Sequence, residues 1–351
     1  MKKALITTLS VILIILTTNC EKYVSDFEYD KKNPRLVLNA ILQPDSIIKI
    51  NISTSQIFNP PTKTTTINNA EISLYEDKTA LGEPTSIGGG YYIFESHYPK
   101  PGSTYRVEVT VEGLETVSAE TTVPPIVDFT ATSHGPVDKP LQDCTGCEPE
   151  LRAEFSLTLN PDTETQLFGT SIMINKAVIE YDYESWECIQ TERTLDDGSI
   201  VIYDSCYYSS ADTLGYYNEY PSFYTNNRAV KFTKNWREYY ISFQEYESHG
   251  TKVYYSTKNQ PSGAFQLNLT VPYWAMNGDE VDKITFWVDA YDEALFQFMY
   301  SLAQAEEVDG DPFAEKVQIY SNVNNGLGIF GAVSSSSVTL EFDVNTYNNY
   351  Y

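Results

Sequence analysis

Two of the five cysteines are spaced so that a hairpin would bring their thiols together. Cys188 and Cys206 flank residues 195–199, which read LDDGS, and a three-residue hairpin loop takes Gly where the backbone is left-handed. If Leu195 pairs with Ser199, Cys188 falls opposite Cys206, because each lies seven positions further from the loop. In an oxidising compartment such a pair normally forms a disulfide. The spacing therefore predicts a cross-strand disulfide.

Cys144 and Cys147 form a second candidate pair, separated by Thr and Gly. We expect a tight structural disulfide here as well. A four-thiolate zinc site is one alternative, although such sites normally use two Cys-x-x-Cys pairs and the chain has one. A redox-active pair is a second alternative, although it would normally open a helix. Here Glu148 and Pro149 follow in an expected loop.

The histidines offer little support for catalysis. His97, His134 and His249 are the only ones, and they lie far apart in the sequence. Neither His-Glu-x-x-His nor Gly-x-Ser-x-Gly occurs. With 48 acidic residues, neighbouring acids arise by chance and do not indicate a calcium or glycosidase site. We therefore predict no enzymatic activity, cofactor or metal, and keep a hydrolase as an alternative because triads are assembled in space.

Aromatic residues are the stronger signal. The chain has 28 tyrosines, and they gather between residues 203 and 255. Tyr combines a large rigid face with a polar tip and is enriched at binding surfaces. Neighbours in a strand point to opposite faces, so one residue of each Tyr pair can be exposed. The alternative is that these rings cover a sandwich core. The candidate binding surface consists of Tyr207, Tyr208, Tyr216, Tyr217, Trp236, Tyr239 and Tyr240.

The N-terminus has the pattern of an export signal. Lys2 and Lys3 precede an apolar run over residues 4–16, which is shorter than the roughly 17–25 residues that span a bilayer. The run leads through small and polar residues to Cys20, an arrangement that resembles a lipobox. We predict a signal peptide over 1–19, acylated Cys20 as the bilayer anchor, and a flexible acidic tether to residue 33. An ordinary signal peptide with an incidental cysteine is the alternative.

The charge balance limits the partners. The formal net charge is −25, and removal of residues 1–19 takes away two lysines and no acid. Such a surface repels the phosphates of nucleic acids and anionic lipid headgroups. Nucleic acid is therefore excluded as a partner.

Strand patterns dominate the rest of the chain. Residues 34–125 alternate apolar and polar positions between Gly and Pro turns, which predicts an immunoglobulin-like β-sandwich. Residues 126–346 have longer, aromatic-rich strands and predict a larger antiparallel β-sandwich, with a final strand over 338–342. One amphipathic helix is expected near 293–306, with Leu295, Phe298, Met299 and Leu302 on its apolar face.

Three segments resemble a Bacteroidota outer-membrane lipoprotein family of unknown function (domain-of-unknown-function family 4249). They are NPRLVLNA at 33–40, NNAEISLY at 68–75, and DPFAE at 311–315 followed by IYSNVNNGLGIFG at 319–331. We interpret Gly326, Gly328 and Gly331 as a turn held to the core, or as sites of close packing against neighbouring strands.

Members of that family are typically encoded beside TonB-dependent receptors. The resemblance therefore implies an accessory or binding role at such a receptor in nutrient uptake. The acidic residues after Cys20 are similar to the surface-export signal of Bacteroidota lipoproteins, and this implies the cell surface, with the periplasmic face as the alternative. A peptide or glycan ligand is compatible with the Tyr-rich surface. A structural or adhesive envelope protein is the second hypothesis for function.

Overall fold

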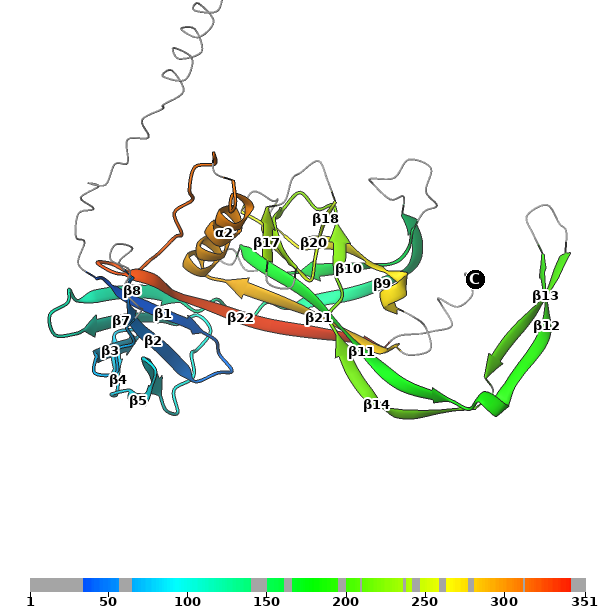
Figure 1. Cartoon of the computed structure of the whole chain (residues 1–351), viewed down its shortest axis with the longest axis horizontal. Helices are drawn as coiled ribbons and strands as arrows, with labels where there is room; N and C mark the ends of the chain where they lie inside the picture. The colour runs from blue at the N-terminus through cyan, green and yellow to red at the C-terminus, as the bar shows by residue number, and fades with distance from the viewer. Residues whose placement is uncertain are drawn as a thin grey trace, which may run out of the picture. The chain divides into compact units, whose positions relative to one another are not determined.

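The computed structural model describes residues 34–56, 65–139, 150–160, 166–194, 200–208, 210–235, 238–241, 247–258, 263–276, 281–311 and 313–341. These residues form β-strands, two 3-10 turns and one α-helix (Figure 1), which confirms the predicted all-β class with sandwich-like sheets. The expected signal peptide, Cys20 and the tether lie outside the described residues. Within the described ranges, no helix combines the length and apolar character needed to cross a membrane.

The first eight strands build a small sandwich-like module. They are β1 (Leu36–Leu42), β2 (Ile48–Thr54), β3 (Glu71–Glu76), β4 (Thr79–Leu81), β5 (Thr85–Gly88), β6 (Tyr91–Phe94), β7 (Thr104–Thr110) and β8 (Val117–Thr122). Alternate side chains are fully buried in β7, as the sequence pattern predicts. A four-stranded sheet, β4-β3-β7-β8, shares one core with β1, β2 and β6 of a larger sheet.

A second core lies between the rest of that larger sheet and a five-stranded sheet, β18-β15-β20-β10-β9. Across it, the rings of Phe155 and Phe286 approach to 5.2 Å between centroids. The elements of this part are β9 (Phe129–Lys139), β10 (Glu150–Leu159), β11 (Leu167–Tyr181), η1 (Tyr183–Ser185), β12 (Trp186–Thr194), β13 (Ile200–Tyr208), β14 (Ala211–Glu219), β15 (Phe223–Thr225), β16 (Val230–Asn235), β17 (Glu238–Ile241), β18 (Ser248–Gly250), β19 (Lys252–Ser256), β20 (Phe265–Pro272), η2 (Tyr273–Met276), β21 (Val281–Tyr291), α2 (Glu293–Glu307) and β22 (Leu327–Glu341).

The last strand, β22, belongs to both parts. Its residues 327–332 pair in parallel with β1, and its residues 333–341 pair antiparallel with β21. Of the three glycines, Gly326 lies in a bend just before this strand, whereas Gly328 and Gly331 lie inside it. The turn is therefore confined to the residues before the strand, and the close-packing interpretation is confirmed for Gly328, which lies against Leu38 of β1. The strand also begins earlier than the predicted residue 338. In the order of the sheet, β22 lies between β21 and β1, so one long strand takes part in both cores.

Helix α2 begins one residue after Asp292, whose carboxylate accepts hydrogen bonds from the backbone N–H groups of Ala294 and Leu295. The predicted span of 293–306 is confirmed to within one residue. The apolar face is rotated from the expected one, since Ala294, Phe296 and Ala303 are buried while Phe298 and Leu302 are half-buried. The helix packs against Phe232, Tyr254, Ile329 and Val333 of the sheet.

Candidate binding surface

A two-stranded ribbon leaves the larger sheet between residues 177 and 218. Beyond Lys176, β11 loses its pairing with β21 and pairs with β14 alone, up to the pair Tyr181 and Ala211. The chain then passes through η1 into β12 and β13, which pair with each other and with no third described strand (Figure 1). We call residues 177–218 the ribbon.

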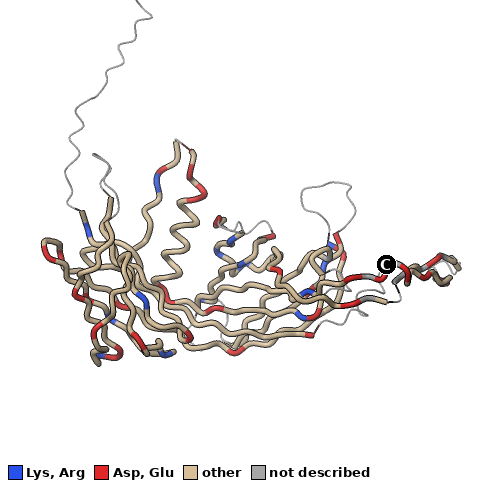
Figure 2. Tube along the Cα trace, turned by 60° about the horizontal axis from the view of Figure 1, so that its bottom comes forward, with Lys and Arg blue, Asp and Glu red and all other residues tan. Residues whose placement is uncertain are grey.

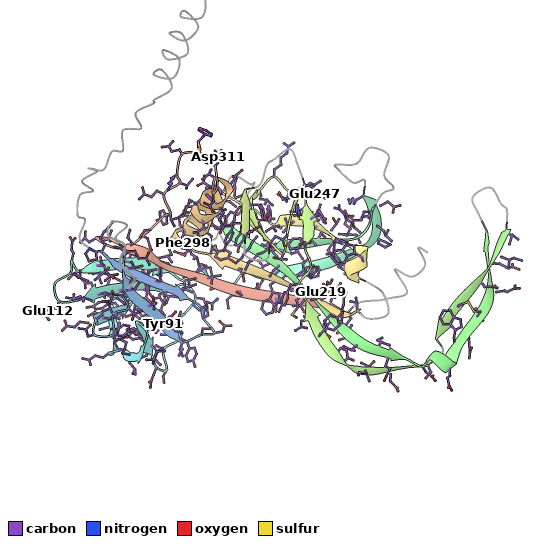
Figure 3. The ribbon with its side chains drawn as sticks, viewed as in Figure 1. Tyr91, Glu112, Glu219, Glu247, Phe298 and Asp311 are labelled. Carbon is purple, nitrogen blue, oxygen red and sulfur yellow. A yellow bond between two sulfur atoms is a disulfide. The ribbon has the colours of Figure 1, made fainter. Side chains whose placement is uncertain are left out.

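Hydrogen bonds fix the joint between the two halves of the ribbon. Ser185 Oγ accepts from the N–H of Ser210 at 3.0 Å and donates to the carbonyl oxygen of Asp182 at 2.6 Å. The N–H of Asp182 donates to the carbonyl oxygen of Ser210. At the root of the ribbon, Lys176 forms an ion pair with Glu219, which is labelled in Figure 3, at 2.7 Å. The ribbon is thus bonded at its root and at its joint.

The predicted disulfide is present in the ribbon. Cys188 lies opposite Cys206 in the β12–β13 register, their Cα atoms are 4.0 Å apart, and their sulfurs are bonded. The register derived from the loop is therefore confirmed. The other predicted pair, Cys144 and Cys147, lies outside the described residues.

The described part of the ribbon carries exposed apolar side chains. From residue 178 to 218, none of the side chains that the structure describes is buried. Five of its large apolar side chains are between 51% and 64% exposed: Trp186, Ile189, Ile200, Ile202 and Leu214. Contiguous exposed apolar side chains mark sites of interaction more often than single ones do.

Strand alternation and register place three of these residues on one face. Trp186, Ile202 and Ile200 share a face with the disulfide, because they stand an even number of positions from Cys188 or Cys206. Ile189 lies on the opposite face. We call the face with Trp186 the ribbon face.

The ribbon is strongly acidic. Arg193 is its one basic residue, against nine acids: Glu180, Asp182, Glu184, Glu187, Glu192, Asp196, Asp197, Asp204 and Asp212. Figure 2 shows Asp and Glu recurring along its described part. The surface therefore combines apolar contact area with negative charge.

The predicted tyrosines do not form one platform. Tyr216 and Tyr217 lie on β14 of the ribbon and are 61% and 44% exposed, while Tyr207 and Tyr208 belong to β13. Trp236 lies outside the described residues.

Tyr239 and Tyr240 lie elsewhere, on β17 beside α2. The N–H of Tyr239 donates to the carboxylate of Glu306 at 2.6 Å, and the hydroxyl of Tyr240 donates to Glu238 at 2.5 Å. The predicted surface is therefore divided between the ribbon and the α2 side of the sheet.

Other tyrosines of the cluster are core residues, as the alternative interpretation expected. Tyr254 stacks on Phe232 with ring centroids 4.3 Å apart, and the hydroxyls of Tyr255 and Thr170 are 3.0 Å apart. Burial raises the pKa of Tyr254, Tyr255 and Tyr291. These phenols are therefore neutral packing groups.

Lys252 and Asp289 form a largely buried ion pair beside these rings. The carboxylate of Asp289 also accepts hydrogen bonds from the hydroxyls of Tyr291 and Ser335. Gly169 leaves room for the cluster, since a Cβ there would meet Lys252 and Tyr291 at 3.0 Å. With each charge paired, the cluster has the features of a structural network.

One pair could in principle support nucleophilic chemistry. His134 Nε2 and Ser156 Oγ, on the neighbouring strands β9 and β10, are 2.8 Å apart. Among the described residues, no carboxylate contacts the His134 ring, so the acid that would orient a catalytic histidine is missing there. His97 bonds the carbonyl oxygen of Glu95, and His249 stacks on Tyr224. The described ranges also contain no cluster of three or more potential metal ligands.

Comparison with known proteins supports the family and leaves the activity open. A family model described as a domain of unknown function (DUF4249) matches residues 21–339, which confirms the resemblance of the motifs. No curated protein matches the chain. A crystal structure of a protein from Corynebacterium diphtheriae, described as membrane anchored, is 11% identical, with 74% of this chain and 54% of that chain covered. The chain thus spans about half the length of that protein, and the TM-score of 0.18 supports no conclusion.

Proposed function

The chain belongs to the family described as a domain of unknown function (DUF4249), and from this premise we propose that it is a lipoprotein of the cell envelope that acts as a binding or accessory subunit at an outer-membrane TonB-dependent receptor in nutrient uptake. Acylated Cys20 would anchor it to the outer membrane of a Bacteroidota cell, on the outer face. The proposal combines the lipobox-like sequence before residue 20 with the surface of the folded body.

The observation that carries the proposal is the ribbon. A chain segment in which Trp186, Ile200 and Ile202 are each more than half exposed has the properties of a binding surface. Two-stranded ribbons are marginal in water by themselves, and this one is held by a disulfide. A peptide or glycan is a further ligand that exposed Tyr216 and Tyr217 would suit.

Co-purification tests the proposal. The tagged full-length protein is expected to bring down a large β-barrel protein from detergent-solubilised outer membranes. Cys20→Ser is expected to abolish membrane fractionation. If the parent protein were recovered at high yield without a barrel protein, a structural or adhesive role would replace the receptor role. If Cys20→Ser still fractionated with the outer membrane, the lipid anchor would be refuted.

The contact between His134 and Ser156 keeps a hydrolase as a second candidate. Purified protein is to be assayed with a generic aryl ester. Turnover that is lost in Ser156→Ala and in His134→Ala, while both variants keep the thermal transition of the parent, would establish the enzyme. We expect no turnover, because the described residues supply no carboxylate for the histidine.

A further inference from the structure

We propose that the β12–β13 end of the ribbon inserts into an apolar groove with Lys and Arg side chains at its rim, on a second and different protein. This inference rests on the proposed function, since the receptor is the partner expected to carry the groove. It goes further by naming the docking surface and the chemistry that recognises it.

The ribbon face supplies the apolar part of the contact. Trp186 stands at its base, the Cys188–Cys206 disulfide follows, and Ile202 and Ile200 stand toward the loop. Trp186, Ile202 and Ile200 each expose more than half of their surface. The disulfide holds the two strands in register, so the row of apolar groups is preorganised before any partner arrives.

The dimensions of the ribbon favour insertion over flat docking. Nine residues per strand at about 3.3 Å each give a length of roughly 30 Å, and two strands give a width of about 10 Å. One such face offers only a few hundred Å², whereas a stable interface needs about 800 Å² from each partner. Ile189 adds apolar contact on the opposite face, so a groove that encloses both faces gives the required area.

The negative charge of the ribbon indicates what kind of partner binds it. Glu192 pairs with Ile202 and Asp204 lies two positions from it on the same strand, so carboxylates are interleaved with the apolar side chains. Two ribbons with nine acids and one Arg each would repel, which argues against a second copy of this chain. A groove lined by apolar side chains and edged by Lys and Arg complements the surface.

A photo-crosslinking residue at position 202 of the full-length lipidated protein tests the docking in intact cells. A crosslink to an outer-membrane barrel protein, identified by mass spectrometry, is expected from position 202. None is expected from position 87, where Ile87 is similarly exposed at 52% on β5. No crosslink from position 202, or a crosslink to a second copy of the chain, would overturn the inference.

Binding variants separate this inference from the proposed function. Ile200→Asp combined with Ile202→Asp is expected to lower barrel recovery by about tenfold or more, whereas Ile87→Asp leaves it unchanged. If the parent recovered the barrel and the double variant recovered it equally, the ribbon inference would fail while the receptor role stood. If the parent recovered no barrel but position 202 crosslinked to another protein, the receptor role would fail. The ribbon inference would then hold only if that protein carried the basic-edged apolar groove, and it would be overturned otherwise.

The role of the ribbon carboxylates in binding is tested separately, with a matched control. Glu192→Gln with Asp204→Asn is expected to weaken binding and to reduce its dependence on salt. Glu112→Gln with Glu120→Gln removes the same charge from the N-terminal module, where Glu112 is labelled in Figure 3, and is expected to change neither. An equal effect of the two double variants would refute recognition by local charge. Unchanged thermal transitions would show that all variants are folded.

Discussion

Gly328 lies so close to Leu38 that a Cβ at position 328 would stand 2.1 Å from the carbonyl oxygen of Leu38. The φ angle of Gly328 is +105°, a conformation that other residues rarely adopt. The contact lies in the parallel pairing of β1 with β22, where Leu38 is the partner of Gly328. The glycine therefore allows the last strand to join the first module.

Gly328→Ala should destabilise the protein by about 3–5 kcal/mol, since the new methyl group adds overlap to backbone strain. Gly113→Ala is the matched control, because Gly113 also has positive φ but has open space around it. We expect a cost of about 1–2 kcal/mol there, from backbone strain alone. Denaturant unfolding measures both, and equal losses would contradict the close approach.

Asp292→Ala should cost about 2–4 kcal/mol. Its carboxylate caps α2 and also accepts from the N–H of Ala332 at 2.9 Å and from the hydroxyl of Thr121 at 2.8 Å. The substitution thus removes a cap and leaves further buried donors without partners. Asp311→Ala, which removes a carboxylate bonded to the N–H of Phe313 in an exposed turn, is expected to cost well under half as much. Similar losses in denaturant unfolding would argue against a central role for Asp292.

Replacement of Cys188 and Cys206 by Ser should loosen the ribbon without unfolding the body. The disulfide spans 18 positions, and a loop of this size corresponds to about 3 kcal/mol of restriction on the unfolded segment. Limited proteolysis with mass spectrometry is expected to show cuts between residues 186 and 208 in the variant only. Because none of the described side chains from residue 178 to 218 is buried, the main thermal transition should stay within a few degrees of the parent. A large drop in that transition would show that the ribbon supports the core.

Buried tyrosines should make the protein sensitive to alkali. Burial raises the pKa of Tyr254, Tyr255 and Tyr291 in the folded chain, so the unfolded chain loses these phenolic protons first. The stability they contribute is complete below about pH 10 and is lost as the pH rises toward the folded pKa values. Ultraviolet absorbance of tyrosinate is expected to show a late group of residues that ionise only as the protein unfolds. Tyr254→Phe should shrink that group.

Local rules in the sequence were sufficient for some features. The loop at residues 195–199 sets the register of its own hairpin, so the pairing of Cys188 with Cys206 could be predicted. The helix after Asp292 could be predicted from the spacing of its apolar residues. In both cases the decisive residues are close neighbours in the chain.

Contacts between residues far apart in the sequence determined the features that local rules could not predict. Tyr254 and Tyr255 are consecutive and both buried, because β19 has α2 on one side and the five-stranded sheet on the other. Tyr216 and Tyr217 are also consecutive, yet both are exposed, because the described ribbon has no covering layer. Both strands contain the same Tyr-Tyr pair. Sequence alone therefore could not divide the tyrosine cluster into core and surface.

The pairing of β1 with β22 has a consequence for how the protein is made. The residues that join there, such as Asn39 and Ile329, are 290 positions apart, so the first strand must wait for almost the whole polypeptide to be synthesised. Until then, the backbone N–H and C=O groups along one edge of β1 are unpaired and could pair with a strand of another chain. Contacts of such long sequence separation slow folding, and a chain that is exported unfolded would need a chaperone to guard its N-terminal strands until the C-terminus emerges.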